Sequence, residues 1–357
     1  MNDNNDNKEN ETEVENNLSM EKKSRSNSNT KQREEVDPRN RLNDLSNKEW
    51  MISTKSVWKS ETINDNIDIL GEDEWQAFSE WLIEIKGVET AEKILDQILP
   101  SVIYSRPPSR DKLKSQHPAT FAETDIERLL RFFTKQDQRV LDPFVGSGST
   151  LIACKATNRN GVGIELVPRW AEIARKRVSG DDLPLFRNIE IEEGYPQQII
   201  DGDAREIMCT LGDETFDFIV TSPPYWKILH KDKDHKVIRE RASKGLDTRY
   251  SELENDLGNI GSYEDFLREL KKVFAECYRV LKDGKYMCVI VSDFRDKGKF
   301  IPFHSNVSES IEKCNFALQG ITILVQDNKN LYPYGIPYSF VSNVCHQNIL
   351  IFRKKTN

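Results

Sequence analysis

Apolar runs of strand length alternate with longer amphipathic segments from residue 125 onward, and this alternation restricts the fold more than any other feature. Apolar residues at helical spacing mark segments 125–135, 150–158, 168–178 and 263–281. Short apolar runs mark strands at 138–144, 161–166, 216–222 and 285–294, and a pair of strands follows at 316–326 and 345–354. The alternation predicts an α/β fold, with a mostly parallel doubly wound sheet and an antiparallel strand near the C-terminus.

The composition is that of an ordinary soluble protein, with 31% charged and 37% hydrophobic residues. No apolar run approaches the roughly 18 residues of a membrane span, and the polar start MNDNNDNKENETEVENN is unlike a secretory signal. The six cysteines are scattered without a CxxC pair, so we expect no metal site, no disulfide framework and a reducing, cytoplasmic location. The net charge of −8 argues against a general basic coat but allows a local basic face.

Composition divides the chain into three regions. Residues 1–42 are polar and carry few aliphatic side chains, so we expect a disordered tail there. Residues 43–110 hold Trp50, Trp58, Trp75 and Trp81 with apolar residues at helical spacing, which predicts a small helical region. Residues 111–357 contain the alternating pattern and form the third region.

Three acidic residues lie where predicted strands end, and in a doubly wound sheet ligands bind at that edge. Asp142 precedes a turn with Gly146 and Gly148, where the missing side chains let the backbone approach a ligand. Glu165 ends the next strand, where a carboxylate can accept hydrogen bonds from both hydroxyls of a ribose, and Asp203 follows a third strand-like run, placed to reach an adenine amino group. Each acid alone is more simply a cap or turn residue. Together, with no basic residue to hold a phosphate among them, they predict a nucleoside site.

Four motifs, DPFVGSGST, GIEL, DGDA and TSPPY, together resemble those of the DNA amino-methyltransferases, which transfer a methyl group from S-adenosylmethionine to N4 of cytosine or N6 of adenine. The similarity covers about residues 111–353 and implies a Rossmann-like methyltransferase fold, with residues 111–357 as the catalytic domain. It implies that the cofactor S-adenosylmethionine is bound by His117, Pro118, Phe121, Asp142, Phe144, Gly146, Gly148, Glu165, Asp203 and Ala204. It implies catalytic roles for Ser222, Pro223, Pro224 and Tyr225.

The double proline fits this chemistry. An exocyclic amine is a poor nucleophile because its lone pair is delocalised into the ring, so acceptors must hold the NH2 group with its lone pair facing the methyl. The hydroxyl of Ser222 and the carbonyl of Pro223 are such acceptors, and two prolines stiffen the loop and remove competing N–H donors. Tyr225 is expected to stack on a base flipped out of double-stranded DNA, because the nitrogen cannot be reached inside the duplex.

The choice of target base depends on Ser222. In the family that this chain resembles, serine at this position accompanies N4-cytosine methylation more often, whereas aspartate or asparagine accompanies N6-adenine. We therefore expect an N4-cytosine methyltransferase of a restriction-modification system, with a cognate restriction endonuclease as a partner. N6-adenine methylation remains an alternative, as do an RNA or protein-glutamine methyltransferase and, from another class, a catalytically silent DNA-binding partner subunit.

The segment from Lys227 to Arg249 carries eight basic and four acidic residues directly after the catalytic motif. It is either a solvated charged loop or a lid that contacts DNA phosphates. The candidate DNA contacts are Lys227, Lys231, Lys233, Lys236, Arg239, Arg241, Lys244 and Arg249. Because no large recognition domain follows the catalytic half, recognition is expected in residues 43–110, in residues 227–262 or in a partner subunit. Trp226 either extends the stacking wall or anchors the charged loop.

Overall fold

The computed structural model describes residues 36, 40–46, 50, 57–59, 80–81, 83–84, 86–87, 90, 122–179, 195–227, 251, 253–325 and 340–355. The chain divides into two units, Met1–Lys55 and Ser56–Asn357. In the first unit, the side-chain oxygen of Asn40 accepts hydrogen bonds from the backbone N–H groups of Leu42 (3.0 Å) and Asn43 (3.1 Å), which forms a local turn. The three-region division of the chain stays a prediction. Within the described residues, no helix combines the length and the apolar character needed to cross a membrane.

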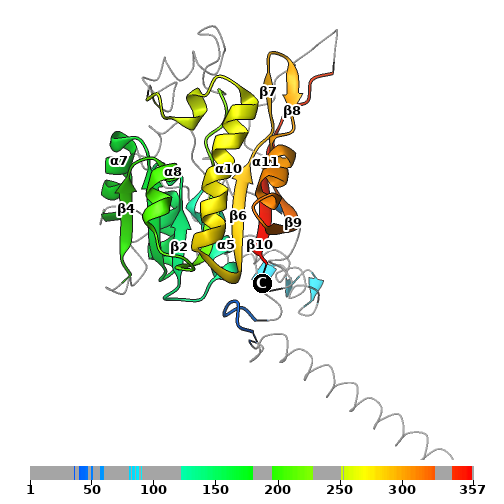
Figure 1. Ribbon diagram of the computed structural model, residues 1–357. Coiled ribbons are helices and arrows are strands. Elements are labelled where there is room, and N and C mark those ends of the chain that lie inside the picture. Colours follow the sequence, from blue (N-terminus) through cyan, green and yellow to red (C-terminus); the bar gives the residue numbers. More distant parts are fainter. Residues whose placement is uncertain are drawn as a thin grey trace, which may run out of the picture. The chain divides into compact units, whose positions relative to one another are not determined.

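The second unit is built on one eight-stranded sheet (Figure 1). Its strands are β1 (Val57–Lys59), β2 (Arg139–Asp142), β3 (Asn160–Glu165), β4 (Gln197–Asp201), β5 (Phe216–Thr221), β6 (Leu281–Val291), β9 (Phe316–Val325) and β10 (His346–Lys354). Their order is β1-β9-β10-β6-β5-β2-β3-β4. The neighbours pair in parallel except around β10, which is antiparallel to both β6 and β9. The predicted Rossmann-like sheet with an antiparallel strand near the C-terminus is confirmed.

Helices cover both faces of this sheet (Figure 1). One face carries α5 (Glu123–Phe133), α6 (Ser149–Ala156) and α7 (Pro168–Ser179), and the other carries α8 (Ala204–Ile207), α10 (Tyr263–Val280) and α11 (Phe303–Glu312). Short 3-10 turns occur at Met208–Thr210 and Leu257–Asn259. The predicted helical segments thus form α5, α6, α7 and α10. α5, α7 and α10 each bury one apolar stripe against the strands, whereas α6 is buried on almost all sides.

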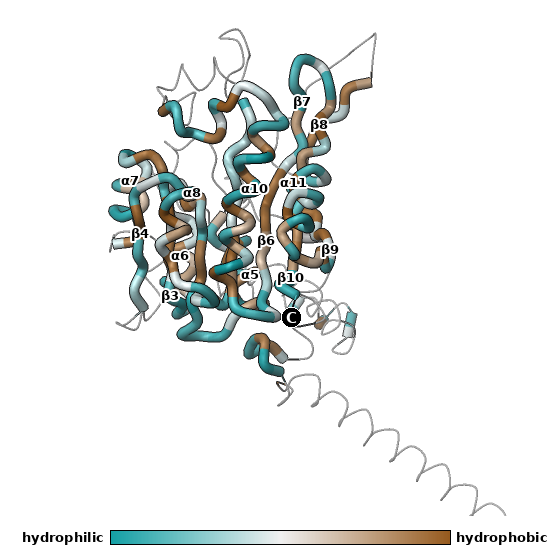
Figure 2. Tube along the Cα trace, in the orientation of Figure 1, coloured by the Kyte–Doolittle hydropathy of each residue, from teal (hydrophilic) through white to brown (hydrophobic). Residues whose placement is uncertain are grey.

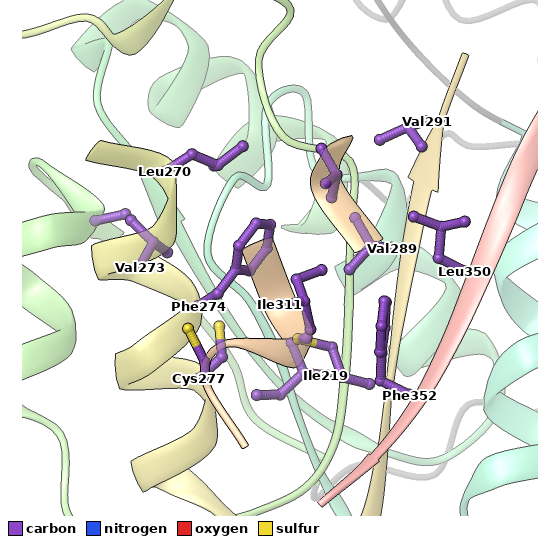
Figure 3. Close-up of a cluster of buried hydrophobic side chains, with 14 of the residues drawn as sticks. Ile219, Leu270, Val273, Phe274, Cys277, Val289, Val291, Ile311, Leu350 and Phe352 are labelled. Carbon is purple, nitrogen blue, oxygen red and sulfur yellow. The ribbon is translucent and has the colours of Figure 1, made fainter. Parts of the chain in front are cut away.

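The larger core lies between the sheet and the layer of α10 and α11. Figure 3 shows α10 contributing Leu270, Val273 and Phe274, which point toward Ile219 of β5 and Val289 of β6. Figure 2 shows β6 as hydrophobic toward its C-terminal end, where Met287–Val291 are buried, as a strand covered on both faces requires. Burial of each large apolar side chain contributes about 1.5–3 kcal/mol, so this core holds the strand ends in fixed relative positions.

Four elements differ from the expectation or were not predicted. Val57–Lys59 is a strand inside the region expected to be helical, because it pairs in parallel with the edge of β9, and three residues are too few for periodicity to identify. A two-stranded hairpin, β7 (Phe294–Asp296) and β8 (Lys299–Ile301), follows β6, and α11 follows the hairpin. The apolar spacing of Phe303, Val307 and Ile311 was the available sequence signal for α11.

Candidate functional site

The predicted motifs meet at the carboxyl ends of the parallel strands. The order of the sheet reverses between β2 and β5, since β3 and β4 lie on one side of β2 whereas β5 and β6 lie on the other. A crevice for ligands forms at such a switch point in open α/β sheets. The glycine loop follows β2 and the loop with the two prolines follows β5, so the topology brings both to the same edge.

Asp142 connects these two loops. Its side chain is fully buried, and it accepts hydrogen bonds from the hydroxyl of Thr150 (2.6 Å), the hydroxyl of Thr221 (2.6 Å) and the backbone N–H of Phe144 (3.0 Å). Burial raises the pKa of Asp142 to about 6, although these three hydrogen bonds act to lower it. These three hydrogen bonds hold the Asp142 side chain in the turn, and its predicted contact with the cofactor stays a prediction.

The glycine loop requires glycine for two different reasons. Gly146 and Gly148 have φ values of +53° and +87°, a region that residues with a side chain rarely adopt. A β-carbon at Gly148 would also lie 3.0 Å from the β-carbon of Ala174 on α7. The turn therefore packs directly against α7 at Gly148, and it carries no side chain at its two glycine positions. Phe144 is partly buried and packs against the larger core.

Glu165 is the acid nearest to this loop. Its two oxygens accept hydrogen bonds from the backbone N–H groups of Gly146 (3.0 Å) and Val167 (2.9 Å). Burial raises its pKa to about 7, and the two backbone hydrogen bonds limit the increase. A carboxylate has about four lone-pair sites, so each oxygen retains capacity to accept a further hydrogen bond. The geometry suits a diol that donates to both oxygens.

Asp203 is engaged differently. It caps α8 by accepting the backbone N–H of Arg205 (2.9 Å), and both of its oxygens also accept from the Arg205 guanidinium, at 2.6 Å in the shortest contact. Burial acts to raise the pKa of Asp203, but the hydrogen bonds and charge of Arg205 outweigh it and lower the pKa. Arg205 is itself held by Glu269 of α10 (3.0 Å). The predicted adenine contacts of Asp203 and of Ala204, the first residue of α8, stay predictions.

The loop after β5 is anchored by Tyr225. Its hydroxyl accepts the backbone N–H of Ser292 (2.9 Å) and hydrogen-bonds the side chains of Ser222 and Gln347. Its ring is 9% exposed, and the ring centres of Phe303 and Phe294 lie 5.5 and 6.4 Å from it. Burial raises the pKa of Tyr225 to about 12, so the hydroxyl stays protonated at neutral pH. Tyr225 thereby fixes Ser222 at the end of the strand, while its predicted stacking role stays a prediction.

Trp226 and Lys227 tie the loop to the segment before α10. The indole N–H of Trp226 donates to the carbonyl of Ile260 (2.9 Å), and its ring centre lies 5.2 Å from that of Tyr263. The ammonium group of Lys227 donates to the carbonyl of Gly261 (2.9 Å). Trp226 is thus fixed against the segment before α10, and both alternatives for its role stay predictions.

Several predicted site residues fall outside the part of the chain that the structure describes. Among the cofactor candidates these are His117, Pro118 and Phe121, and among the DNA contacts they are Lys231, Lys233, Lys236, Arg239, Arg241, Lys244 and Arg249. The described candidates are thus the two loops, the three acids and Lys227. Pro223 is buried and Pro224 is partly buried beside Ser222.

A buried ion pair behind the glycine loop was not predicted. Arg177 of α7 contacts Glu123 of α5 at 2.7 Å, with side-chain exposures of 1% and 6%. Arg177 also donates to the carbonyl and the hydroxyl oxygen of Ser147, and the hydroxyl of Ser149 donates to Glu123 (2.9 Å). Charged residues near helix ends look solvent-exposed in a sequence, so only the packing of α5 against α7 reveals this support.

A second unpredicted pair lies just after β6. His304 contacts Asp293 through its ring Nδ1 at 2.7 Å, and the backbone N–H of His304 donates to the same carboxylate (3.1 Å). The negative charge of Asp293 is near enough to act on the pKa of Tyr225. The start of α11 is therefore fixed next to the anchored loop.

The sequence is similar to a family model and to several known proteins. A family model described as DNA methylase matches residues 2–176 and 216–357. The Type II methyltransferase M2.DpnII of Streptococcus pneumoniae is 36% identical over 72 residues, which are 20% of this chain and 27% of that protein. The Type II methyltransferase M.MjaI of Methanocaldococcus jannaschii is 34% identical over 130 residues, 33% of this chain and 41% of that protein.

The matches to curated relatives are partial. The aligned part spans about a quarter of the length of the first three curated relatives. Among solved structures, TrmN from Thermus thermophilus aligns with a TM-score of 0.41 at 14% identity, covering 66% of this chain and 50% of that one.

Proposed function

Because the chain belongs to the DNA methylase family, whose model matches most of its length, we propose that it transfers a methyl group from S-adenosylmethionine to an exocyclic amine of a DNA base. The observation that carries this proposal is the junction of the two loops. Asp142 hydrogen-bonds Thr221, so the candidate cofactor loop and the candidate amine loop share one buried carboxylate. A methyl donor and a methyl acceptor have to meet within a few ångströms, and this junction supplies that proximity.

The cofactor supplies an electrophilic methyl group on a sulfonium centre. Glu165 accepts the two ribose hydroxyls with the lone pairs that its backbone hydrogen bonds leave available. Gly146 and Gly148 let the loop backbone approach the cofactor closely. Asp203 and Ala204 border the adenine, and His117, Pro118 and Phe121 border the methionine end by family resemblance. The residues that the structure describes fit such a ligand, because they combine a buried diol acceptor with a turn that has no β-carbon at Gly146 and Gly148.

The amine is held by the loop after β5. The hydroxyl of Ser222 and the carbonyl of Pro223 accept the two N–H groups of the target amine, which directs the nitrogen lone pair toward the methyl group. Pro224 keeps the loop rigid, and the Tyr225 hydroxyl positions Ser222. Stacking on a flipped base needs more of the Tyr225 ring than the 9% now exposed, so we assign the positioning role to Tyr225 first. The amine proton leaves after transfer, and no strongly basic group is required.

We assign the target as N4 of cytosine, with N6 of adenine as the alternative. Serine at position 222 supports the cytosine assignment through the family resemblance. Lys227 and the seven basic residues that follow it in sequence contact the DNA, and a cognate restriction endonuclease is the expected partner in a restriction-modification system.

One experiment tests both the activity and the base. Purified protein is incubated with S-adenosylmethionine labelled in the methyl group and, in separate reactions, with DNA and with RNA of mixed sequence, and each nucleic acid is digested to nucleosides. Label in N4-methylcytosine supports the assignment, and label in N6-methyladenine would show that adenine is the target base. Label in RNA alone would refute the substrate class. A parallel titration by calorimetry separates an enzyme from a silent partner subunit, which would bind DNA without binding S-adenosylmethionine.

A further inference from the structure

The β7–β8 hairpin projects from the same edge of the sheet as the candidate site. It begins at Phe294, three residues after β6 ends at Val291, and α11 begins at Phe303 just after it. Figure 1 shows the hairpin at the end of β6 from which it emerges, beyond the sheet. No part of the sheet needs this hairpin for pairing, because β7 and β8 pair only with each other among the described strands.

The base of the hairpin is fixed to the loop after β5 that contains Ser222 and Tyr225. The ring centre of Phe294 lies 6.4 Å from that of Tyr225 and 6.4 Å from that of Tyr263, both in edge-on contacts. Ile301 at the other end is buried in the same core. Ser292, which lies two residues before the start of β7, donates its backbone N–H to the hydroxyl of Tyr225. The hairpin therefore keeps a defined position relative to Ser222, at little cost in ordering when a partner binds.

The tip of the hairpin is exposed and basic. Residues 297–300 are all exposed, and Figure 2 shows the turn as hydrophilic. Residues 294–301 contain three basic side chains and one acidic one, in a chain whose net charge is −8. Within the described part of the chain, no ion pair reaches Lys297 or Lys299, whereas most other exposed lysines of the helices pair with a carboxylate.

The turn is also rigid. Lys297 and Gly298 have φ values of +45° and +82°, which is the pattern of a two-residue type I′ turn. The guanidinium of Arg295 donates to the carbonyl of Gly298 (3.1 Å) and lies over the ring of Phe300, 5.5 Å from its centre. Arg295 thus stabilises the turn, and the side chains of Lys297 and Lys299 are exposed to solvent.

We propose that the β7–β8 hairpin is a DNA-contacting arm, in which Lys297 and Lys299 bind backbone phosphates beside the nucleotide whose base enters the site. This inference rests on the proposed function. Phosphate contacts fix the register of a protein on the duplex, and a lysine without a partner gains counterion release when it binds DNA. The arm follows β6, the strand next to β5 in the sheet.

The test compares two double variants with equal changes of charge. Lys297→Ala/Lys299→Ala removes the proposed contacts, and Lys176→Ala/Lys313→Ala removes two exposed lysines of α7 and α11 that pair with Glu172 and Glu309. Binding of fluorescein-labelled random-sequence duplex DNA is followed by anisotropy over a range of NaCl concentrations. The hairpin variant should reduce the slope of log Kd against log salt by about two and weaken binding at least about tenfold at physiological salt. The control should retain the wild-type slope.

Three further readouts make the outcome decisive. Circular dichroism and S-adenosylmethionine affinity should be unchanged in the hairpin variant, and Lys297→Glu/Lys299→Glu should weaken DNA binding further. If the hairpin variant keeps the slope and affinity of the control, the arm does not contact DNA. If the wild-type protein binds S-adenosylmethionine but neither binds nor methylates DNA, the proposed function fails, and the arm fails with it.

Discussion

The carboxylate of Asp142 at the end of β2 accepts a hydrogen bond from the hydroxyl of Thr221 at the end of β5, with an oxygen–oxygen distance of 2.6 Å. Both residues are fully buried. One contact thus fixes the distance between the loop proposed for the methyl donor and the loop proposed for the methyl acceptor.

Replacing this carboxylate should destabilise the protein. Asp142→Ala leaves the hydroxyls of Thr150 and Thr221 without their acceptor, and each unsatisfied buried polar group costs about 1–3 kcal/mol. We expect the free energy of unfolding to fall by about 2–5 kcal/mol in urea titrations. The exposed Glu309→Ala is the matched control and should change stability by less than about 0.5 kcal/mol. Equal values for the two variants would contradict a structural role for the Asp142–Thr221 contact.

Cofactor affinity should depend on pH through Glu165. Its pKa is raised to about 7, and a diol that donates hydrogen bonds binds the ionised carboxylate better. Protonation below pH 7 therefore weakens binding, and S-adenosylmethionine should bind about tenfold more weakly at about pH 6 than at about pH 8, as a one-unit displacement below the pKa implies. Calorimetry at each pH measures the effect. In Glu165→Gln the affinity should be lower and nearly constant across this range, whereas an unchanged pH dependence would assign the titration to another group.

Ser222 should affect turnover and leave cofactor binding intact. Ser222→Ala removes one acceptor for the amine, and loss of one preorganised polar contact to the reacting group costs on the order of 10²-fold in kcat. The dissociation constant of S-adenosylmethionine should stay within about twofold, because the glycine loop and Glu165 are untouched. Single-turnover methylation of DNA measures the first quantity and calorimetry the second. Wild-type turnover in this variant would remove Ser222 from the mechanism.

Tyr225→Phe tests positioning separately. The variant keeps the ring in the core but removes the hydroxyl that joins Ser222, Gln347 and Ser292. We expect kcat to fall by about tenfold with KM for DNA little changed, as for loss of alignment of a reacting group. A purely structural hydroxyl would lower the melting temperature and leave kcat unchanged.

Breaking the buried ion pair between Arg177 and Glu123 should lower the free energy of unfolding more than replacing both charged residues together. Arg177→Met removes the buried guanidinium that contacts Glu123, which should destabilise the fold by about 3–5 kcal/mol. The double variant Glu123→Gln/Arg177→Met removes both charges and should recover part of that loss. Urea titrations of Arg177→Met, Glu123→Gln and the double variant provide the measurement, and additive losses would show that the two charges do not support each other.

Much of the sheet could be predicted, because its strands and helices carry strong periodic signals. Segment 168–178 matches α7, and 263–281 matches α10 to within one residue. The hairpin was missed because β7 and β8 have three residues each, too few to show a period, although the Lys297-Gly298 turn was a usable signal. β1 was missed because a three-residue edge strand exists through its pairing with β9.

By itself the sequence determined which residue types stand at the strand ends: an acid at the end of β2, an acid at the end of β3, an acid after β4 and a serine with two prolines after β5. It could do so because chain order and strand direction place those ends on one edge of a parallel sheet. Only the tertiary structure decided how each side chain is used. Asp142 accepts hydrogen bonds from two hydroxyls, Asp203 binds the guanidinium of Arg205, and the Tyr225 ring packs in the core. These contacts need the folded chain, because hydrogen-bond partners far apart in sequence become neighbours only when the layers pack.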